Sequence, residues 1–243
     1  MVLVSSSVDQ LTNPCRDFSL QQVTTLTYKL LYIIEDVHKH QMLHLDIKPG
    51  NICIRDKDGC QTVHLVDFGS SKSYVEPGTD KHLELAVGQS MFSTHTFASS
   101  NAHSGIRCSR RDDLESLFYT MIYMYKSELP WEHVPVYNEN EDGDRFYHSV
   151  PCSLGDRMVS TGIGSKVNEL CFDCPKQFVD FIKYVRELEF ETKPDYEYLR
   201  ELLTHLSQQN GFDISKINFD FEGLSHPTKK LEKSGLIDVF RKF

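Results

Sequence analysis

Two short stretches carry side chains whose types and spacing suit phosphoryl transfer. The first reads HLDIKPGN, begins at His44 and contains Asp46, Lys48 and Asn51, and the second is the triplet DFG that begins at Asp67. One carboxylate can orient an attacking hydroxyl and accept its proton, and a lysine can neutralise phosphate charge. An asparagine and a second carboxylate supply the oxygen ligands that Mg²⁺ prefers. The set predicts transfer of a phosphoryl group from a magnesium nucleotide.

Each stretch alone has a simpler interpretation, as a chance triplet or a solvated turn. Together and in this order they match the protein-kinase pattern HRDLxxxN followed by DFG. One position departs from the pattern, because Leu45 stands where an arginine is usual. That arginine normally binds a phosphorylated activation loop, so its replacement argues against control by such a phosphate more than against catalysis.

The elements that position these stretches are predicted from turn residues and from hydrophobic spacing. Strands over residues 52–54 and 62–66 flank a turn at 56–59, so the two stretches lie at the ends of a small hairpin. The polar segment 67–99 lacks periodicity, and its place after DFG suggests an activation segment. Residues 137–166 are interpreted as a surface loop with at most a short helix inside.

Four helices are predicted from apolar residues at helical spacing. The first begins at Ser19, where Gln22 completes a capping-box pattern, and it ends near His40, just before the catalytic loop. The other three surround the apolar stripes from Leu114 to Tyr125, from Phe178 to Leu188 after Pro175, and from Tyr196 to Leu206. Such stripes are interpreted as core rather than as binding surfaces.

The composition is that of a folded protein of one or two domains. The 243 residues are 40% hydrophobic and 25% charged, with a net charge of −9, which argues against nucleic acid as a partner. No apolar run approaches the roughly 20 residues of a membrane span. Seven scattered cysteines fit reduced thiols, so the protein is expected inside the cell, in the cytoplasm, the nucleus or both, and not on a membrane. The CxxC pair at Cys171 lacks the partners of a zinc site.

Longer stretches carry a more specific resemblance. They read LVDFGSSKSY from Leu65, FASSNAH from Phe97, SRRDDLESL from Ser109, LPWE from Leu129 and KPDYEYLRELL from Lys193. Together with HLDIKPGN they resemble the casein kinase I family and its tau-tubulin and vaccinia-related relatives, over nearly the whole chain. That family has a Ser-x-Asn element in place of the common APE motif, and residues 99–101 supply it.

The resemblance implies a serine/threonine protein kinase that uses ATP and Mg²⁺. By position it makes Asp46 the catalytic base, Lys48 a contact to the transferred phosphate, and Asn51 and Asp67 the ligands of Mg²⁺ and the nucleotide. Asp113 matches a buried aspartate that caps the backbone of the catalytic loop. His44 is expected to support the same loop.

The resemblance also implies a mainly α, α+β fold: the large lobe of a protein kinase with a small β hairpin. This lobe is expected over residues 1–210, beginning at the hinge, with an extension over 211–243 that packs on the lobe or trails from it. Its aromatic residues Phe212, Phe219 and Phe221 are available for packing, and residues 229–243 are expected as a short exposed helix or a frayed end. The amino-terminal lobe, with its GxGxxG loop and strand lysine, is expected to be absent.

Without that lobe, ATP binding is expected to be weak or absent and activity very low. Loss of one preorganised charge donor already costs about 10²- to 10³-fold in rate. The expected partners are protein substrates or full-length kinase relatives. A second interpretation is a non-catalytic, pseudokinase-like module that competes with such relatives, and a third is the product of a truncated or decaying gene copy.

Substrate choice is expected to differ from that of the family, which favours acidic or phosphate-primed substrates. Between Asp67 and Ser99 only Lys72 and Lys81 carry fixed positive charge, beside three further carboxylates. Because clustered cations bind phosphate, this recognition is expected to be weakened or lost. Lys81 and Arg107 are the residues whose substitution tests this.

Overall fold

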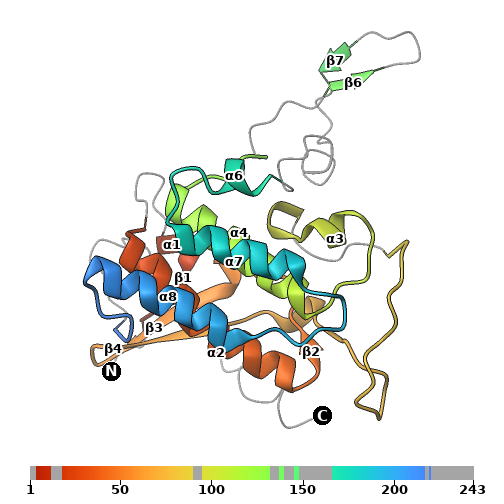
Figure 1. The fold of residues 1–243 in the computed structure, drawn as a ribbon. Helices are drawn as coiled ribbons and strands as arrows, with labels where there is room; N and C mark the ends of the chain where they lie inside the picture. The colour runs from red at the N-terminus through yellow and green to blue at the C-terminus, as the bar shows by residue number, and fades with distance from the viewer. Residues whose placement is uncertain are drawn as a thin grey trace.

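The computed structural model describes residues 4–11, 18–89, 95–131, 137–139, 145–147, 166–216 and 219. These residues form helices and three small sheets (Figure 1). The expectations for Phe221 and for residues 229–243 lie outside the described residues, as does most of the predicted loop at 137–166. No described helix is long and apolar enough to cross a membrane.

Four helices form the body of the fold, close to where hydrophobic spacing predicts them. They are α2 (Leu20–Lys39), α4 (Arg110–Lys126), α7 (Lys176–Glu187) and α8 (Tyr196–Asn210). Helix α2 contacts both α4 and α8, and α7 lies against α4 and α8 (Figure 1). Their apolar faces meet in one core, where the rings of Phe118 and Phe181 stack with centroids 5.8 Å apart.

The start of α2 confirms the capping box. The Ser19 hydroxyl accepts a 3.2 Å hydrogen bond from the Gln22 N–H, and the Gln22 side-chain oxygen accepts a 3.0 Å bond from the Ser19 N–H. The helix ends at Lys39, and strand β2 (Met42–Leu43) begins after two intervening residues. Helix α2 and β2 therefore lead into the loop that begins at His44 and contains the predicted catalytic residues.

The predicted hairpin is formed by β3 (Ile52–Lys57) and β4 (Cys60–Leu65), in antiparallel register with Ile52 opposite Leu65. The turn between them places Gly59 at a φ of 79°, which glycine adopts without a steric penalty. A third strand, β1 (Val4–Ser7), pairs with β3, so the sheet has the order β1-β3-β4. Strand β2 pairs separately with β5 (Lys72–Ser73).

The remaining elements are short. They are α1 (Val8–Leu11), α3 (Ser100–His103), α6 (Val167–Leu170) and the 3₁₀ turns η1 (Pro49–Asn51), η2 (Phe68–Ser70) and η3 (His95–Phe97). The segment predicted as a loop without strands contains β6 (Tyr137–Glu139) and β7 (Arg145–Tyr147), which pair antiparallel. Strands of three residues are too short to show a period of two in the sequence.

The carboxyl-terminal tail returns to the body at Phe219. Its ring is 5% exposed and packs edge-on against Phe18 with centroids 5.4 Å apart. The Gln61 side chain donates to the Phe219 carbonyl at 2.7 Å and accepts from its N–H at 2.9 Å. Phe219 therefore contacts Phe18 and the beginning of β4.

Candidate active site

The loop between β2 and β3 brings three predicted site residues together. Asp46 Oδ2 accepts hydrogen bonds from Lys48 Nζ at 2.7 Å and from Asn51 Nδ2 at 2.9 Å. Asn51 Nδ2 also donates to the Asp46 carbonyl at 2.8 Å. The Asp46 side chain is 11% exposed and that of Lys48 is 26% exposed. The Asp46 carboxylate is therefore held by the Lys48 ammonium group and the Asn51 amide, and it is mostly buried but still reaches solvent.

The DFG triplet starts at the other end of the hairpin. The N–H of Val66, next to Asp67, donates to the Asn51 carbonyl at 2.9 Å, so both predicted Mg²⁺ ligands leave the same end of the sheet. Asp67 is exposed and has a φ of 63°, and its Oδ1 accepts from the Gly69 N–H at 3.2 Å. A Cβ at residue 69 would lie 3.1 Å from that oxygen, so glycine gives the carboxylate room.

The oxygen atoms at this end fit a hard cation. The side-chain Nδ2 of Asn51 donates to Asp46, so the side-chain Oδ1 of Asn51 points away from Asp46. Mg²⁺ is commonly held by one or two protein oxygens together with nucleotide phosphates and water. Within the described ranges no group of three or more His, Cys, Asp or Glu side chains is arranged for a metal ion. Asn51 and Asp67 are the two residues that would hold Mg²⁺, together with nucleotide phosphates and water.

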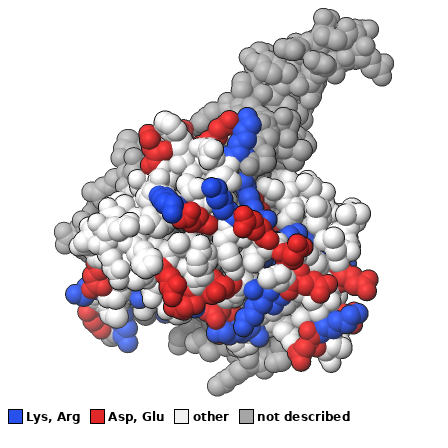
Figure 2. Space-filling model, viewed as in Figure 1, with Lys and Arg blue, Asp and Glu red and all other residues white. Residues whose placement is uncertain are grey.

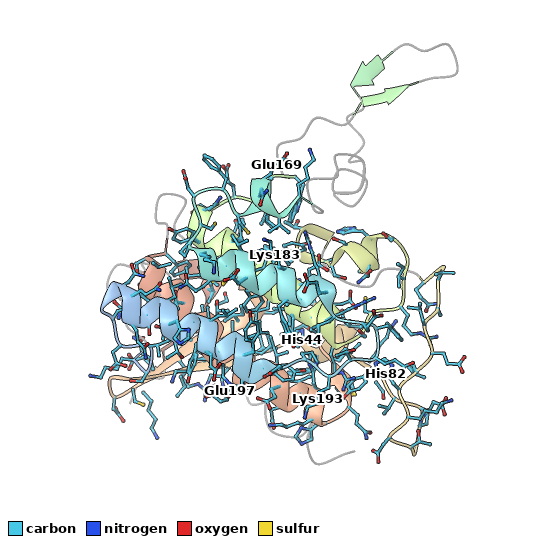
Figure 3. The ribbon with its side chains drawn as sticks, in the orientation of Figure 1. His44, His82, Glu169, Lys183, Lys193 and Glu197 are labelled. Carbon is cyan, nitrogen blue, oxygen red and sulfur yellow. The ribbon has the colours of Figure 1, made fainter. Side chains whose placement is uncertain are left out.

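His44, which is labelled in Figure 3, contacts both stretches. Its Nε2 lies 3.1 Å from the Val66 carbonyl, its Nδ1 accepts from the Asp46 N–H at 3.3 Å, and its ring packs edge-on against Phe68 at 4.8 Å. Because a carbonyl only accepts, the proton is on Nε2. Burial lowers the pKa of His44, and the nearby Asp113 opposes this only partly. A neutral His44 therefore joins the catalytic loop to DFG.

Asp113 at the start of α4 holds the backbone of the catalytic loop. Its carboxylate accepts from the His44 N–H at 2.7 Å and from the Leu45 N–H at 2.8 Å, and His38 Nε2 lies 2.9 Å away. Burial alone would raise the pKa of Asp113, but the side-chain hydrogen bond to His38 and the backbone hydrogen bond from the His44 N–H lower it. Asp113 is therefore a buried carboxylate that orients the loop without reaching the surface.

Three further residues support this network and escape the sequence reasoning. His38 Nδ1 lies 2.6 Å from the Tyr196 hydroxyl, so α8 helps to orient the histidine that meets Asp113. Thr120, two turns after Asp113 on α4, donates to the Ile47 carbonyl at 3.3 Å. For His38 and Thr120 the only signal in the sequence is a polar residue within an apolar helical stripe, and this does not identify the residue's partner.

The geometry of these two stretches agrees with a comparison of the whole sequence with family models. A model described as Protein kinase domain matches residues 2–199. The chain belongs to the protein kinase domain family. Domains of this family generally use ATP and Mg²⁺, which is the chemistry that the carboxylates, lysine and asparagine of the two stretches suit.

In this kinase domain the activation segment is attached by apolar contacts at the position of the unusual leucine. Leu45 packs on the buried cluster of Leu43, Tyr74 and Val75, together with Cys108. The Tyr74 hydroxyl donates to the His38 carbonyl at 2.6 Å, and the Arg110 guanidinium lies 4.7 Å above the Tyr74 ring. Apolar packing, the Tyr74 hydrogen bond and the Arg110 guanidinium thus hold the start of the segment that follows DFG.

The Ser-x-Asn element of the kinase domain is bound to α4. The Ser99 hydroxyl and Asn101 Nδ2 donate to Asp112 Oδ1 at 2.6 and 3.0 Å. Asp112 Oδ2 accepts from the Ser109 N–H at 2.7 Å. Burial raises the pKa of Asp112 to about 6, although these hydrogen bonds oppose the rise. Both aspartates of the SRRDD stretch therefore hold segments that border the site. Asp113 binds the loop that contains Asp46, and Asp112 binds the Ser-x-Asn element.

Proposed function

We propose that this protein kinase domain belongs to the casein kinase I group and transfers phosphate to serine or threonine of proteins. Asp46 accepts the proton of the attacking hydroxyl, Lys48 contacts the transferred phosphate, and Asn51 and Asp67 bind Mg²⁺. The observation that carries the proposal is the position of the Asp46 carboxylate, which Lys48 and Asn51 both contact within 2.9 Å. ATP bound with Mg²⁺ supplies the phosphoryl group.

Each residue of the loop has a separate task in this mechanism. Asp46 accepts the proton of the attacking hydroxyl, and Lys48 Nζ, 2.7 Å from Asp46 Oδ2, neutralises phosphate charge. Lys48 lies next to Asp46, so its ammonium group can contact the transferred phosphate when a substrate hydroxyl is bound at Asp46. The hydrogen bond from Asn51 Nδ2 keeps the Asp46 carboxylate oriented during this step. His44 and Asp113 maintain the backbone on which these side chains stand. Positioning of this kind provides most of what a kinase contributes to the rate.

We further propose that the chain alone is a slow kinase with weak affinity for ATP. Protein kinases use a Gly-rich loop and a small-lobe lysine to hold the phosphates. The sequence contains no GxGxxG stretch.

Protein substrates are the proposed partners, with weak recognition of acidic or primed ones. Lys81 Nζ already pairs with Glu76 at 2.8 Å, which raises the pKa of Lys81, and Arg107 Nη1 donates to the Glu84 carbonyl at 2.6 Å. Both cations therefore have partners within the chain.

We also propose that the protein lies inside the cell, because Cys53, Cys171 and the other described cysteines are free thiols.

The proposal is tested by incubating the purified chain with radiolabelled Mg-ATP and casein, followed by phosphoamino-acid analysis. Slow labelling of serine or threonine that requires Mg²⁺ is the expected result. Labelling confined to tyrosine would refute the assignment to the casein kinase I group.

A second candidate function is a non-catalytic binding module that competes with full-length relatives. Leu45 favours it, because this replacement of the usual arginine removes a feature of regulated kinases. If this function is correct, excess chain lowers casein phosphorylation by a full-length relative to the same extent whether residue 46 is Asp or Asn. If catalysis is the function, the chain adds to that phosphorylation.

A further inference from the structure

A hollow opens at the start of α2, at the opposite end of this helix from the loop that contains Asp46. Its empty volume is about 510 Å³. The residues that line it are Ser19, Gln21, Gln22 and Thr25 from the start of α2, with Lys216 and Phe219 from the carboxyl-terminal tail, and none of them is acidic. At about 1.5 Å per residue, the length of α2 separates the hollow from the other end of the helix by roughly 30 Å. The hollow is therefore not part of the candidate active site.

Helix α2 presents its positive end at this hollow. The Gln22 N–H donates to the Ser19 hydroxyl, and the Val23 N–H donates to the Ser19 carbonyl at 3.0 Å. Within the part of the chain that the structure describes, the N–H groups of Leu20 and Gln21 have no hydrogen-bond partner. Two backbone donors and the dipole of a long helix together favour a negatively charged group at this end.

A buried hydroxyl without a partner is a second and independent sign of a ligand. Thr25 is 1% exposed and lines the hollow, and its Oγ1 forms no hydrogen bond among the described residues. A buried polar group in this state costs free energy, which a bound molecule would recover. The hydroxyls of Thr24 and Thr27 also lack partners in the described part of the chain, but neither residue lines the hollow. They provide matched controls for Thr25.

The tail contributes a cation and an aromatic ring to the hollow. The Lys216 side chain is 80% exposed, and its Nζ lies 3.6 Å from Asp213 Oδ2. The other oxygen of Asp213 accepts from the N–H and the hydroxyl of Ser215 at 2.9 and 2.6 Å, which fixes the turn that carries Lys216. An exposed ion pair at 3.6 Å is weak, so the ammonium group is able to turn toward a stronger anion. The Phe219 ring supplies an apolar wall.

The size of the hollow and the spacing of its donors indicate the class of ligand. Five residues separate Leu20 from Thr25, which is about 7–8 Å along the helix, so a single phosphate is too small to reach both. A phosphate ester with hydroxyl groups spans this distance. Its phosphate accepts from N–H groups and an ammonium group, and its hydroxyls match those of Thr25. On the face of the molecule seen in Figure 2, basic side chains are interspersed with acidic ones, so the local donors and not a broad positive surface favour the anion.

We propose that this hollow binds a small phosphorylated polyol. The phosphate lies at the start of α2 between the N–H groups of Leu20 and Gln21 and the Lys216 ammonium group, and the polyol reaches the Thr25 hydroxyl beside the Phe219 ring. This site goes beyond the proposed kinase function, because it shares no residue with the catalytic loop or DFG. Since the ligand contacts both α2 and the tail, its binding also fastens the tail to the body.

The test is isothermal titration calorimetry of the full chain with glycerol phosphate, inorganic phosphate and glycerol, in EDTA so that no metal ion recruits phosphate to Asn51 and Asp67. Glycerol phosphate is expected to bind about tenfold or more tightly than either of the other two, with an affinity that falls as salt is added. Thr25→Val and Lys216→Gln each weaken its binding by about three- to tenfold, because each removes one contact. The matched controls Thr27→Val and Lys176→Gln leave the affinity unchanged; the Lys176 side chain is 85% exposed.

Two further measurements separate lost binding from lost folding. Thr25→Val removes a hydroxyl that has no partner, so the melting temperature of the unliganded variant is expected to equal or exceed that of the native chain. Thr25→Ser keeps the hydroxyl and is expected to keep the affinity for glycerol phosphate within about threefold.

Several outcomes would overturn the site. Equal affinity for inorganic phosphate and glycerol phosphate would indicate an adventitious ion only. Absence of binding by the native chain, an equal loss in Thr27→Val, or a lower melting temperature of unliganded Thr25→Val would each remove the proposal. The titration involves no phosphate transfer, so any of these results leaves the kinase function standing.

Discussion

Asp113 on helix α4 accepts a 2.7 Å hydrogen bond from the backbone N–H of His44, a residue 69 positions earlier in the chain. The same carboxylate accepts from the Leu45 N–H at 2.8 Å, where the backbone has a φ of 65°. A leucine rarely adopts this left-handed conformation. The hydrogen bonds to Asp113 therefore stabilise a strained loop directly before Asp46.

Substitution Asp113→Asn is expected to loosen that loop. The amide keeps one acceptor but turns an NH₂ group toward a backbone N–H, and loss of one partner in a buried charged network costs about 3 kcal/mol or more. Urea unfolding measures the loss of stability, and amide hydrogen exchange at His44 and Leu45 is expected to accelerate. The control is Asp36→Asn, whose side chain is 65% exposed. Equal stability of the two variants would contradict the role of Asp113.

The lowered pKa of His44 predicts acid sensitivity. The folded state resists protonation of this buried ring, whereas the unfolded chain takes up a proton near the ordinary pKa of 6.5. The unfolded state then binds more protons, so the contribution of His44 to stability is complete above pH 6.5 and is lost as the pH falls toward its lower folded pKa. His44→Gln should flatten this part of the curve of unfolding free energy against pH. The exposed His40→Gln variant should not, and identical curves for all three proteins would refute the prediction.

The apolar attachment of the activation segment is tested by Leu45→Arg. Without a phosphate to bind, the new cation meets the apolar cluster of Leu43, Tyr74 and Val75, at a cost of about 1–2 kcal/mol. Limited proteolysis within residues 76–89 is therefore expected to become faster, and Leu45→Met serves as the volume-conserving control. Unchanged or slower cleavage of the arginine variant would show that this cluster does not hold the segment.

The Mg²⁺ site is tested by ligand-induced stabilisation. Mg-ATP that binds only the folded chain raises stability by about 1.4 kcal/mol at ten times its dissociation constant. The corresponding thermal shift should disappear with EDTA and in Asp67→Asn, while Asp58→Asn in the exposed β3–β4 turn keeps it. A shift that survives Asp67→Asn would place the cation elsewhere.

The sequence predicts the parts of this fold that depend on near neighbours. The capping box of Ser19 and Gln22 spans three residues, and the apolar stripes of α2, α4, α7 and α8 repeat within each helix. Strand β1 is different, because Val4 pairs with Asp56 and four residues show too little pattern to predict this. Hydrogen bonds between distant segments leave no local signal.

The candidate site divides in the same way. Asp46, Lys48 and Asn51 lie within one loop, so their spacing alone predicts that they meet. His38 and Tyr196 are 158 residues apart, and only the packing of α2 on α8 brings them together. The resemblance to a known family indicated Asp113 but not the side chains that orient it.

The central claim is that Asp46 acts in phosphoryl transfer. The most direct measurement compares the initial rate of phosphate transfer from radiolabelled Mg-ATP to casein by the native chain and by Asp46→Asn, at equal protein concentration and with both variants shown to be folded. The account predicts a slow but measurable rate for the native chain that Asp46→Asn abolishes. A rate unchanged by Asp46→Asn, or no transfer by the native chain above the level of buffer, would contradict it.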